Sequence, residues 1–363
     1  MAKKILVVDD SALMRRVLCD IINSDTRFRV VNIAGNGLEA LNLLTKGGQY
    51  DAVVLDVNMP QMNGIELLKE LRKKNIRPKI MMASTDTMEG AQVTIECLEL
   101  GAIDFVHKPS SAMDCRDEEF KKHFLDTLFA VSESNTAAAA AAAEPAKSVF
   151  EDEAFKKLAS LASRHKQVTA GSKIVAIASS TGGPKALQSV IPKLPANLNA
   201  PIVMVQHMPV GFTASLAERL TSLGELKVKE AAEGDKLQKG HAYLSKGGAH
   251  MNIVKTGADY TIHYTDEPNR EGVKPCANYM YESLANSGFD EICCVVMTGM
   301  GADGTEGIKN LKNSGKKLHV ITQSEDTCVV YGMPKAAVNA GLSNQVAALD
   351  QIAQEIILNV GVS

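Results

Sequence analysis

Short apolar runs alternate with amphipathic stretches over the first 125 residues of the chain. Strand-like runs occupy residues 4–8, 28–34, 51–55, 78–83 and 103–106, and helical patterns such as GLEALNLLTKG and GIELLKELRKK lie between them. Because a short run that is apolar throughout fits a strand buried on both faces, this alternation predicts a parallel sheet with helices on both sides. We expect a first domain over residues 1–125.

The alternation stops at residues 126–168. Within this segment, SESNTAAAAAAAEPAKS (132–148) contains seven consecutive alanines and no apolar face that would dock a helix. We interpret 126–168 as an alanine-rich linker.

A second domain is expected over residues 169–363. Strand-like runs return at 173–178, 201–206, 227–231, 241–245, 250–255, 260–265, 292–298 and 317–323. The two runs within 250–265 flank a short turn with a glycine, which predicts an antiparallel hairpin. The remaining runs alternate with helical patterns and predict a doubly wound, mostly parallel α/β domain.

Composition narrows the class of protein. A chain of 363 residues is longer than a single hydrophobic core usually accommodates, which indicates two domains. The net charge of −3 and the lack of a basic cluster give no sign of nucleic-acid binding. The seven cysteines form no C-x-x-C pair, which indicates reduced, structural thiols. No run approaches the roughly 20 apolar residues of a membrane helix, and the apolar N-terminal run ends at Asp9, too early for a signal peptide. We expect a cytoplasmic protein.

Acidic residues follow two strands of the first domain. Asp9 and Asp10 come directly after the first strand, and Asp56 comes after the third. Since the carboxyl ends of parallel strands meet at one edge of a sheet, these carboxylates should converge. They could be solvated loop residues or helix caps. Together, however, they would repel one another without a cation, and hard oxygen ligands with room for water suit Mg²⁺.

Two further side chains should face the same edge. Lys108 follows the fifth strand, where its ammonium group could hold the oxygens of a phosphoryl group transferred to a carboxylate. A hydroxyl follows the fourth strand, but the end of that strand cannot be fixed to one residue, so Ser84 and Thr85 both remain candidates.

The segments ILVVDDSALMRRVL, VVLDVNMPQMNG and GAIDFVHKP resemble the receiver domain of response regulators. The resemblance covers about residues 3–125 and implies a flavodoxin-like fold. It also implies that a histidine kinase phosphorylates Asp56, with Asp9 and Asp10 at the Mg²⁺, and that Lys108 and Ser84 sense the phosphoryl group.

The second domain begins with the turn ASSTGGPKAL, which permits several interpretations. A phosphate-binding P-loop would need an earlier glycine, and Pro184 would remove a backbone donor. A nucleophile elbow, G-x-S-x-G, fits if Ala178 replaces the first glycine; the exposed serine is then Ser180, with Ser179 ending the strand. A plain serine-rich helix cap fits equally well.

A serine nucleophile needs a base and an acid that orients the base. His207 directly follows the next strand, which favours it over the other histidines of the domain, namely His241, His250, His263 and His319. For the acid, Asp303 follows the apolar run ICCVVMT and precedes a helical pattern.

The same segment supports a rival interpretation. Gly299, Gly301 and Gly304 spell G-x-G-x-x-G between a strand and a helix, and Glu325 lies beyond the next strand, as in a dinucleotide-binding fold. The charge of Asp303 beside the last glycine would oppose a pyrophosphate. In addition, no convincing third strand follows. From the residues alone, one alternative therefore remains: the second domain could be a nucleotide-binding module, or a module that only binds partners, fused to a receiver domain.

Five segments together resemble the catalytic domain of the chemotaxis protein-glutamate methylesterase family, CheB, over about residues 173–341: ASSTGGPKAL, VQHMPVGFTASLAERL, GHAYLSKGGAHM, MTGMGADG and CVVYGMPKAA. The resemblance implies a triad of Ser180, His207 and Asp303, with Met300 beside the oxyanion site. It implies a phosphorylation-activated serine hydrolase that demethylates glutamate methyl esters, and deamidates glutamines, on chemoreceptors. By this resemblance no cofactor is expected in the catalytic domain, and contact with the membrane is expected only through receptors.

Overall fold

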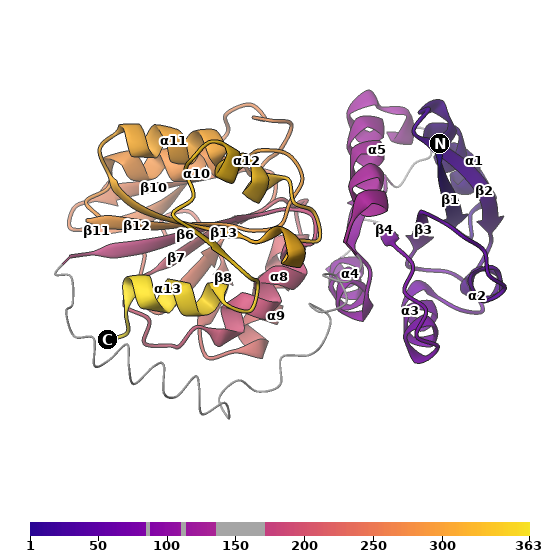
Figure 1. Cartoon of the computed structure of the whole chain (residues 1–363), viewed down its shortest axis with the longest axis horizontal. Helices are drawn as coiled ribbons and strands as arrows, with labels where there is room; N and C mark the ends of the chain where they lie inside the picture. Colours follow the sequence, from indigo (N-terminus) through magenta and orange to yellow (C-terminus); the bar gives the residue numbers. More distant parts are fainter. Residues whose placement is uncertain (85–87, 110–113, 136–170) are drawn as a thin grey trace. The chain divides into compact units, whose positions relative to one another are not determined.

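The computed structural model describes residues 1–84, 88–109, 114–135 and 171–363. The chain divides into two compact units, Met1–Ala143 and Glu144–Ser363 (Figure 1). Of the expected linker 126–168, residues 136–168 lie outside the described part of the chain. No helix within the described ranges is long and apolar enough to cross a membrane.

The first unit is built on a sheet of five parallel strands in the order β2-β1-β3-β4-β5. The strands are β1 (Lys3–Val8), β2 (Phe28–Ala34), β3 (Ala52–Asp56), β4 (Ile80–Ser84) and β5 (Asp104–His107). This order is that of a flavodoxin-like fold. The expected fold of this domain is therefore confirmed, and each of its expected strands is present.

Helices cover both faces of this sheet. They are α1 (Ala12–Ser24), α2 (Gly37–Thr45), α3 (Gly64–Lys73), α4 (Met88–Leu100) and α5 (Glu118–Glu133), with a short 3₁₀ helix at Asp114–Arg116. Helix α1 contacts α5, whereas α2 contacts α3 and α3 contacts α4. Ser11 caps α1 by accepting from the N–H of Met14, so the helix begins directly after the acidic pair.

The first domain extends further than the sequence suggested. Helix α5 continues through residue 125 to Glu133. Phe124, Leu128 and Val131 are buried at the spacing of one helical face, and α5 contacts β3, β4 and β5. This apolar face ties the start of the expected linker to the sheet. The expected boundary at residue 125 thus falls within α5, and we propose that the first domain reaches the end of this helix.

The second unit contains a sheet of seven parallel strands in the order β14-β13-β12-β6-β7-β9-β8. The strands are β6 (Lys173–Ser179), β7 (Ile202–Gln206), β8 (Lys227–Glu230), β9 (His241–Leu244), β12 (Glu291–Val296), β13 (Lys317–Gln323) and β14 (Gln345–Ala347). Strands β10 (His250–Thr256) and β11 (Asp259–Thr265) form a separate antiparallel hairpin. The expected mostly parallel α/β domain with a hairpin is thus confirmed, although β14 was not expected.

Helices lie on both sides of this sheet (Figure 1). On one side are α10 (Ala277–Ser283), α11 (Thr305–Asn313) and α12 (Met333–Asn339); on the other are α8 (Gly183–Val190), α9 (Phe212–Leu223) and α13 (Ile352–Val360). Strands β6 and β12 are buried along their whole length. This burial explains why both strands read as continuous apolar runs.

The direction in which the chain crosses this sheet reverses between β6 and β12. From β6 the chain continues to β7, β8 and β9 on one side, and from β12 it continues to β13 and β14 on the other. In open parallel sheets, ligands bind beyond the carboxyl ends of the strands beside such a reversal. Ser180 follows β6 and Asp303 lies in the loop after β12, so both flank this point.

The opposite edge of the same sheet is held by a buried carboxylate, Glu291. It lies 2.7 Å from Nζ of Lys317 and 3.5 Å from Nζ of Lys173, and it accepts a hydrogen bond of 2.8 Å from the side-chain amide of Asn359. Burial alone would raise the pKa of Glu291, but these partners lower it overall. Glu291 therefore joins the first residues of β6, β12 and β13 to the end of α13.

We expect Glu291→Gln to lower the free energy of unfolding by about 1–3 kcal/mol at neutral pH, because a neutral amide replaces a buried, paired carboxylate. The pKa of Glu291 is lower in the folded chain than in the unfolded chain. Its contribution is therefore complete above the unfolded pKa and is lost as the pH falls through the folded pKa. Urea unfolding followed by circular dichroism at neutral and acidic pH measures both effects.

Glu306→Gln is the matched control. Glu306 lies 3.5 Å from Lys309, and the two side chains are 49% and 55% exposed. Exposed pairs of this kind contribute little, so stability should stay within about 0.5 kcal/mol of wild type. Equal losses in the two variants at neutral pH would contradict the role given to Glu291.

Candidate active site

Ser180 lies in a tight turn between β6 and α8. Its N–H donates to the carbonyl of Thr298 over 3.0 Å, and its carbonyl accepts from the N–H of Gly183 over 2.7 Å. Pro184 occupies the first turn of α8, where no N–H donor is needed. The chain therefore passes from strand to helix in one turn, with Ser180 at the bend.

Close approaches of the backbone require the small residues around this turn. A Cβ at Gly183 would lie 2.0 Å from Oε1 of Gln206, and a Cβ at Gly299 would lie 2.7 Å from the Cβ of Ser180. Both distances are far below van der Waals contact. Glycine at these positions lets the loop after β12 and the side chain of Gln206 reach the serine turn.

The two adjacent serines have different surroundings. Ser179 is fully buried, and its hydroxyl donates to Oε1 of Gln206 over 2.7 Å. Ser180 is partly exposed, and its hydroxyl has no hydrogen-bond partner among the described residues. The sequence left the choice of serine open. The geometry favours Ser180, because the hydroxyl of Ser179 is already engaged within the core.

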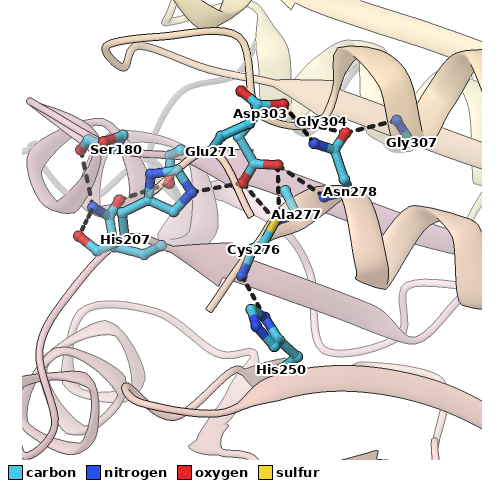
Figure 2. Close-up of polar contacts among 12 residues, drawn as sticks. Ser180, His207, His250, Glu271, Cys276, Ala277, Asn278, Asp303, Gly304 and Gly307 are labelled. Carbon is cyan, nitrogen blue, oxygen red and sulfur yellow. Dashed lines mark hydrogen bonds and ion pairs between the residues drawn. The ribbon is translucent and has the colours of Figure 1, made fainter. Parts of the chain in front are cut away.

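His207 directly follows β7, the neighbour of β6 in the sheet. Ser179 and Gln206 are paired across these strands, and the N–H of His207 donates to the carbonyl of Ser179 over 3.1 Å. On the other side, Nε2 of His207 lies 2.7 Å from Oδ2 of Asp303. Figure 2 shows the imidazole ring between Ser180 and Asp303. The structure thus brings together the three residues expected to form the triad.

The other histidines that the sequence left open lie on different elements. His250 and His263 belong to the hairpin strands β10 and β11. His241 begins β9 at the amino edge of the sheet, and His319 lies within β13. Their positions favour His207 as the histidine that serves Ser180.

Asp303 is buried and strongly hydrogen-bonded. Its Oδ2 accepts from Nε2 of His207 and from the N–H of Ala277 over 2.6 Å. Its Oδ1 accepts from the N–H of Asn278 over 2.9 Å and from the thiol of Cys276 over 3.0 Å. Burial alone would raise the pKa of Asp303, but these donors and His207 lower it overall. The carboxylate therefore stays charged and fixes the imidazole ring.

The glycine-rich segment after β12 is not arranged for a dinucleotide. Gly304 caps α11, and the N–H groups of Gly304 and Gly307 donate to Oδ1 of Asn278 over 3.0 and 2.6 Å. These helix-start donors, which could otherwise face a pyrophosphate, are thus occupied. Strand β14 pairs with β13 and supplies a third strand, so the expected lack of a third strand is wrong.

Backbone donors are available beside Ser180. Within the described residues, the N–H groups of Thr181, Gly182 and Met300 have no hydrogen-bond partner. The first two precede α8, whose amino end carries partial positive charge. Met300 follows Gly299, which packs against Ser180. This position supports the predicted place of Met300 beside an oxyanion, a role that stays a prediction.

A second cluster of polar side chains lies at the carboxyl edge of the first sheet. Asp9, Asp10 and Asp56 offer carboxylate oxygens that all lie within 4.8 Å of one another. Nζ of Lys108 lies 2.7 Å from Oδ2 of Asp9 and 3.0 Å from Oδ2 of Asp56. The structure thus brings together four of the residues that the sequence singled out in this domain.

The charges of this cluster favour a hard cation. Burial raises the pKa of Asp56; Lys108 opposes this rise, and Asp9 adds to it. Burial would lower the pKa of Lys108, but Asp56 and Asp9 raise it overall. One ammonium group among three carboxylates leaves an excess of negative charge, and Asp10 is exposed to solvent. Carboxylate oxygens with access to water fit Mg²⁺.

Ser84 ends β4 next to Lys108. Its carbonyl accepts from the N–H of Lys108 over 2.7 Å, and its hydroxyl accepts from Oγ1 of Thr94 over 2.9 Å. The alternative residue, Thr85, lies outside the described residues. The sensing role of Ser84 therefore stays a prediction.

Sequence reasoning missed three residues that support the triad. Gln206 donates from Nε2 to the carbonyls of Ser180 and His207 over 2.9 and 3.1 Å, which ties the two loops together. The thiol of Cys276 and the N–H of Asn278, at the start of α10, donate to Oδ1 of Asp303. For Gln206 the available signal was an amide at the end of an apolar run, because a buried amide needs partners.

Both units match known families. Residues 175–356 match the profile of the family described as CheB methylesterase, and residues 5–118 match that described as response regulator receiver domain. The protein-glutamate methylesterase/protein-glutamine glutaminase of Geobacillus kaustophilus (strain HTA426) is 41% identical over 358 residues, which cover 99% of each chain. The protein of that name from Bacillus subtilis (strain 168) is 40% identical over 357 residues, or 97% of each chain.

A solved structure matches the second unit. The Thermotoga maritima CheB methylesterase catalytic domain aligns with a TM-score of 0.51 at 39% identity, over 100% of that chain and 53% of this one. Together with the family matches, this likeness confirms both resemblances that the sequence motifs suggested.

Proposed function

Because this chain belongs to the CheB methylesterase family, we propose that it is a phosphorylation-controlled serine hydrolase that removes methyl groups from glutamate methyl esters on chemoreceptors. The names of the relatives pair this activity with glutamine deamidation, which we assign to the same site. The observation that carries the proposal is the arrangement of Ser180, His207 and Asp303 where the strand order reverses.

In the first step, Ser180 attacks the carbonyl carbon of the ester while His207 takes the serine proton. Since Nε2 of His207 faces Asp303, Nδ1 is the ring nitrogen left to accept that proton. The common serine-hydrolase arrangement has the reverse assignment, with Nδ1 on the acid and Nε2 on the serine. The resting tautomer of this enzyme therefore carries its proton on Nε2.

The oxyanion that forms is stabilised by the N–H groups of Thr181, Gly182 and Met300, which have no partner within the described residues. Each such donor typically contributes about 10²–10³ in rate. His207 then gives its proton to the departing methoxide, which leaves as methanol. Water attacks the acyl-enzyme with His207 as base, and the glutamate carboxylate is released. A glutamine follows the same steps and releases ammonia.

The first unit supplies control. Asp56 accepts a phosphoryl group from a histidine kinase, and Asp9, Asp10 and Asp56 would hold the Mg²⁺ that this transfer needs. The bound ion would neutralise charge on the incoming phosphoryl group. Lys108, already within 3.0 Å of Asp56, holds the transferred oxygens, and Ser84 at the end of β4 senses them.

This activity implies where the protein works and which partners it meets. Its substrates are the cytoplasmic parts of membrane receptors, so the enzyme works in the cytoplasm and meets the membrane only through those receptors. The catalytic unit needs no cofactor, because the triad supplies nucleophile, base and acid. The net charge of −3 agrees with a partner that is not a nucleic acid.

The direct test is methanol release from methylated receptor membranes by the full chain, with and without a small-molecule phosphodonor and Mg²⁺. We expect the phosphodonor to raise the rate. Asp56→Asn removes the carboxylate that accepts the phosphoryl group, so this variant should keep the basal rate and lose the response completely.

An equal response of wild type and Asp56→Asn to the phosphodonor would contradict control through Asp56. Asp51→Asn is the matched control, because Asp51 lies at the amino edge of the same sheet, where it accepts from the N–H of Lys4 over 2.7 Å. This variant should respond like wild type.

A further inference from the structure

A buried thiol contacts the acid of the site and has no part in the mechanism above. Sγ of Cys276 lies 3.0 Å from Oδ1 of Asp303, and Cys276 is fully buried. Figure 2 shows Cys276 between Asp303 and His250. Apart from this thiol, Oδ1 accepts from the N–H of Asn278.

The thiol is the donor in this contact. The carboxylate of Asp303 is ionised, and burial together with the charge of Asp303 raises the pKa of Cys276 far above its usual value. The sulfur therefore keeps its proton and directs it at Oδ1. Side chains at the position of Cys276, the N-cap of α10, commonly accept from helix N–H groups. Here Asp303 accepts from the N–H groups of Ala277 and Asn278 at the start of the helix.

His250 holds the backbone of Cys276 from the other side. Its Nδ1 accepts from the N–H of Cys276 over 3.2 Å, and its Nε2 carries the ring proton toward the carbonyl of Pro268, 3.3 Å away. Burial lowers the pKa of His250, which favours the neutral ring that this arrangement needs. The ring also packs on Tyr279, with centroids 4.5 Å apart. The thiol is therefore presented to Asp303 from a fixed backbone.

We propose that Cys276 is a positioning residue for ester hydrolysis: its thiol holds Oδ1 of Asp303, so that Oδ2 stays aimed at Nε2 of His207. The inference rests on the proposed function of the Ser180 site. Without the thiol, Oδ1 keeps the N–H of Asn278 and Oδ2 keeps the N–H of Ala277, but Oδ1 loses one of its two donors. The negative charge that the thiol shared then acts more strongly on His207.

This change in charge has a measurable consequence. A carboxylate that has lost one donor attracts positive charge on the facing imidazole of His207 more strongly. The enzyme needs the neutral ring as base. Loss of the thiol therefore moves the acid limb of the pH–rate profile to higher pH, which simple loss of packing would not do.

The test compares Cys276→Ala, Cys276→Ser and wild type as full chains activated by a small-molecule phosphodonor. The readout is the pH dependence of kcat and kcat/KM for methanol release from a peptide with a glutamate methyl ester. We expect Cys276→Ala to raise the midpoint of the acid limb by about 0.5 pH unit and to lower kcat about threefold to tenfold. Effects of this size are expected when a charged acceptor loses a weak hydrogen-bond donor such as a thiol. Cys276→Ser restores a donor, so the midpoint of its acid limb should be equal to or lower than that of wild type.

Cys293→Ala is the matched control. Cys293 is fully buried in β12, so the variant removes the same atoms from the same domain, and its midpoint should equal that of wild type. If Cys276→Ala keeps the wild-type midpoint, even at reduced kcat, the thiol merely fills space and the proposal is wrong. A Cys276→Ser midpoint as high as that of Cys276→Ala would overturn it equally.

Infrared spectroscopy of the S–H stretch gives a readout that needs neither activity nor a folded alanine variant. The difference spectrum between wild type and Cys276→Ser isolates the band of this thiol. A thiol that donates to a carboxylate should absorb at lower frequency than that of Cys293, isolated in the same way, and equal frequencies would overturn the proposal. Methanol release that does not depend on Ser180 would instead overturn the proposed function and leave this band unaffected.

Discussion

Ser180→Ala is expected to abolish methyl-ester hydrolysis, with a fall in kcat of about 10⁴-fold or more. Ser180 is at the bend of the β6–α8 turn, its hydroxyl is unpaired within the described residues, and His207 lies on the neighbouring loop. Alanine removes the nucleophile and leaves the glycines that shape the turn in place. Methanol release by the phosphorylated full chain measures the loss, and thermal unfolding shows whether the variant is folded.

Ser179→Ala separates this role from a general need for serine in the turn. Its hydroxyl donates to Gln206 in the core. Losing that bond leaves one amide oxygen short of a donor, which should lower activity no more than about tenfold. A larger loss in Ser179→Ala than in Ser180→Ala would show that the nucleophile has been assigned to the wrong residue.

Asp303→Asn is expected to lower kcat by about 10⁴-fold, although it changes the shape of the side chain very little. An amide turned with its NH₂ toward His207 makes Nε2 an acceptor and moves the ring proton to Nδ1, where the base must accept the serine proton. An amide turned the other way places its NH₂ against the N–H of Asn278 and the thiol of Cys276. Either orientation breaks part of the site.

Methanol release again gives the measurement, with Asp290→Asn as the matched control. Asp290 precedes β12 at the amino edge of the sheet, where it accepts from the N–H of Ser172 over 2.6 Å. Its amide variant should hydrolyse esters at close to the wild-type rate. Near-normal kcat in Asp303→Asn would remove the acid from the proposed mechanism.

Most strands could be predicted from the sequence, because strands buried on both faces read as continuous apolar runs. Strand β6, KIVAIAS, is buried at every position. Strand β14 was not predicted, because its three residues, one of them exposed, form no apolar run. Only its pairing with β13 defines it as a strand. The end of α5 was missed because its apolar face leads directly into the alanine-rich segment, whose composition suggested a linker.

The site could be predicted as far as the ends of strands. Ser180, His207 and Asp303 each follow a strand, and a parallel sheet brings such ends to one edge. The choice between Ser179 and Ser180 could not be made, since it depends on where β6 ends to within one residue. That end is defined by pairing with β7 and by the hydrogen bond from Ser179 to Gln206.

The contacts behind Asp303 could not be predicted. Cys276 and Asn278 lie at the start of a short helix, and no periodic pattern marks them. Their role arises because a carboxylate from the loop after β12 accepts from the first N–H groups of α10. A contact of this kind between distant segments follows from tertiary packing and leaves no trace in local propensity.

The bond between His207 and Asp303 joins positions 96 residues apart, and the hairpin, α10 and β12 lie between them. A chain still emerging from the ribosome therefore carries the proposed nucleophile and base long before the proposed acid is translated. By the proposed mechanism, such a nascent chain lacks a complete triad. Because the receiver is synthesised first, the regulatory half is complete before the activity that it governs exists.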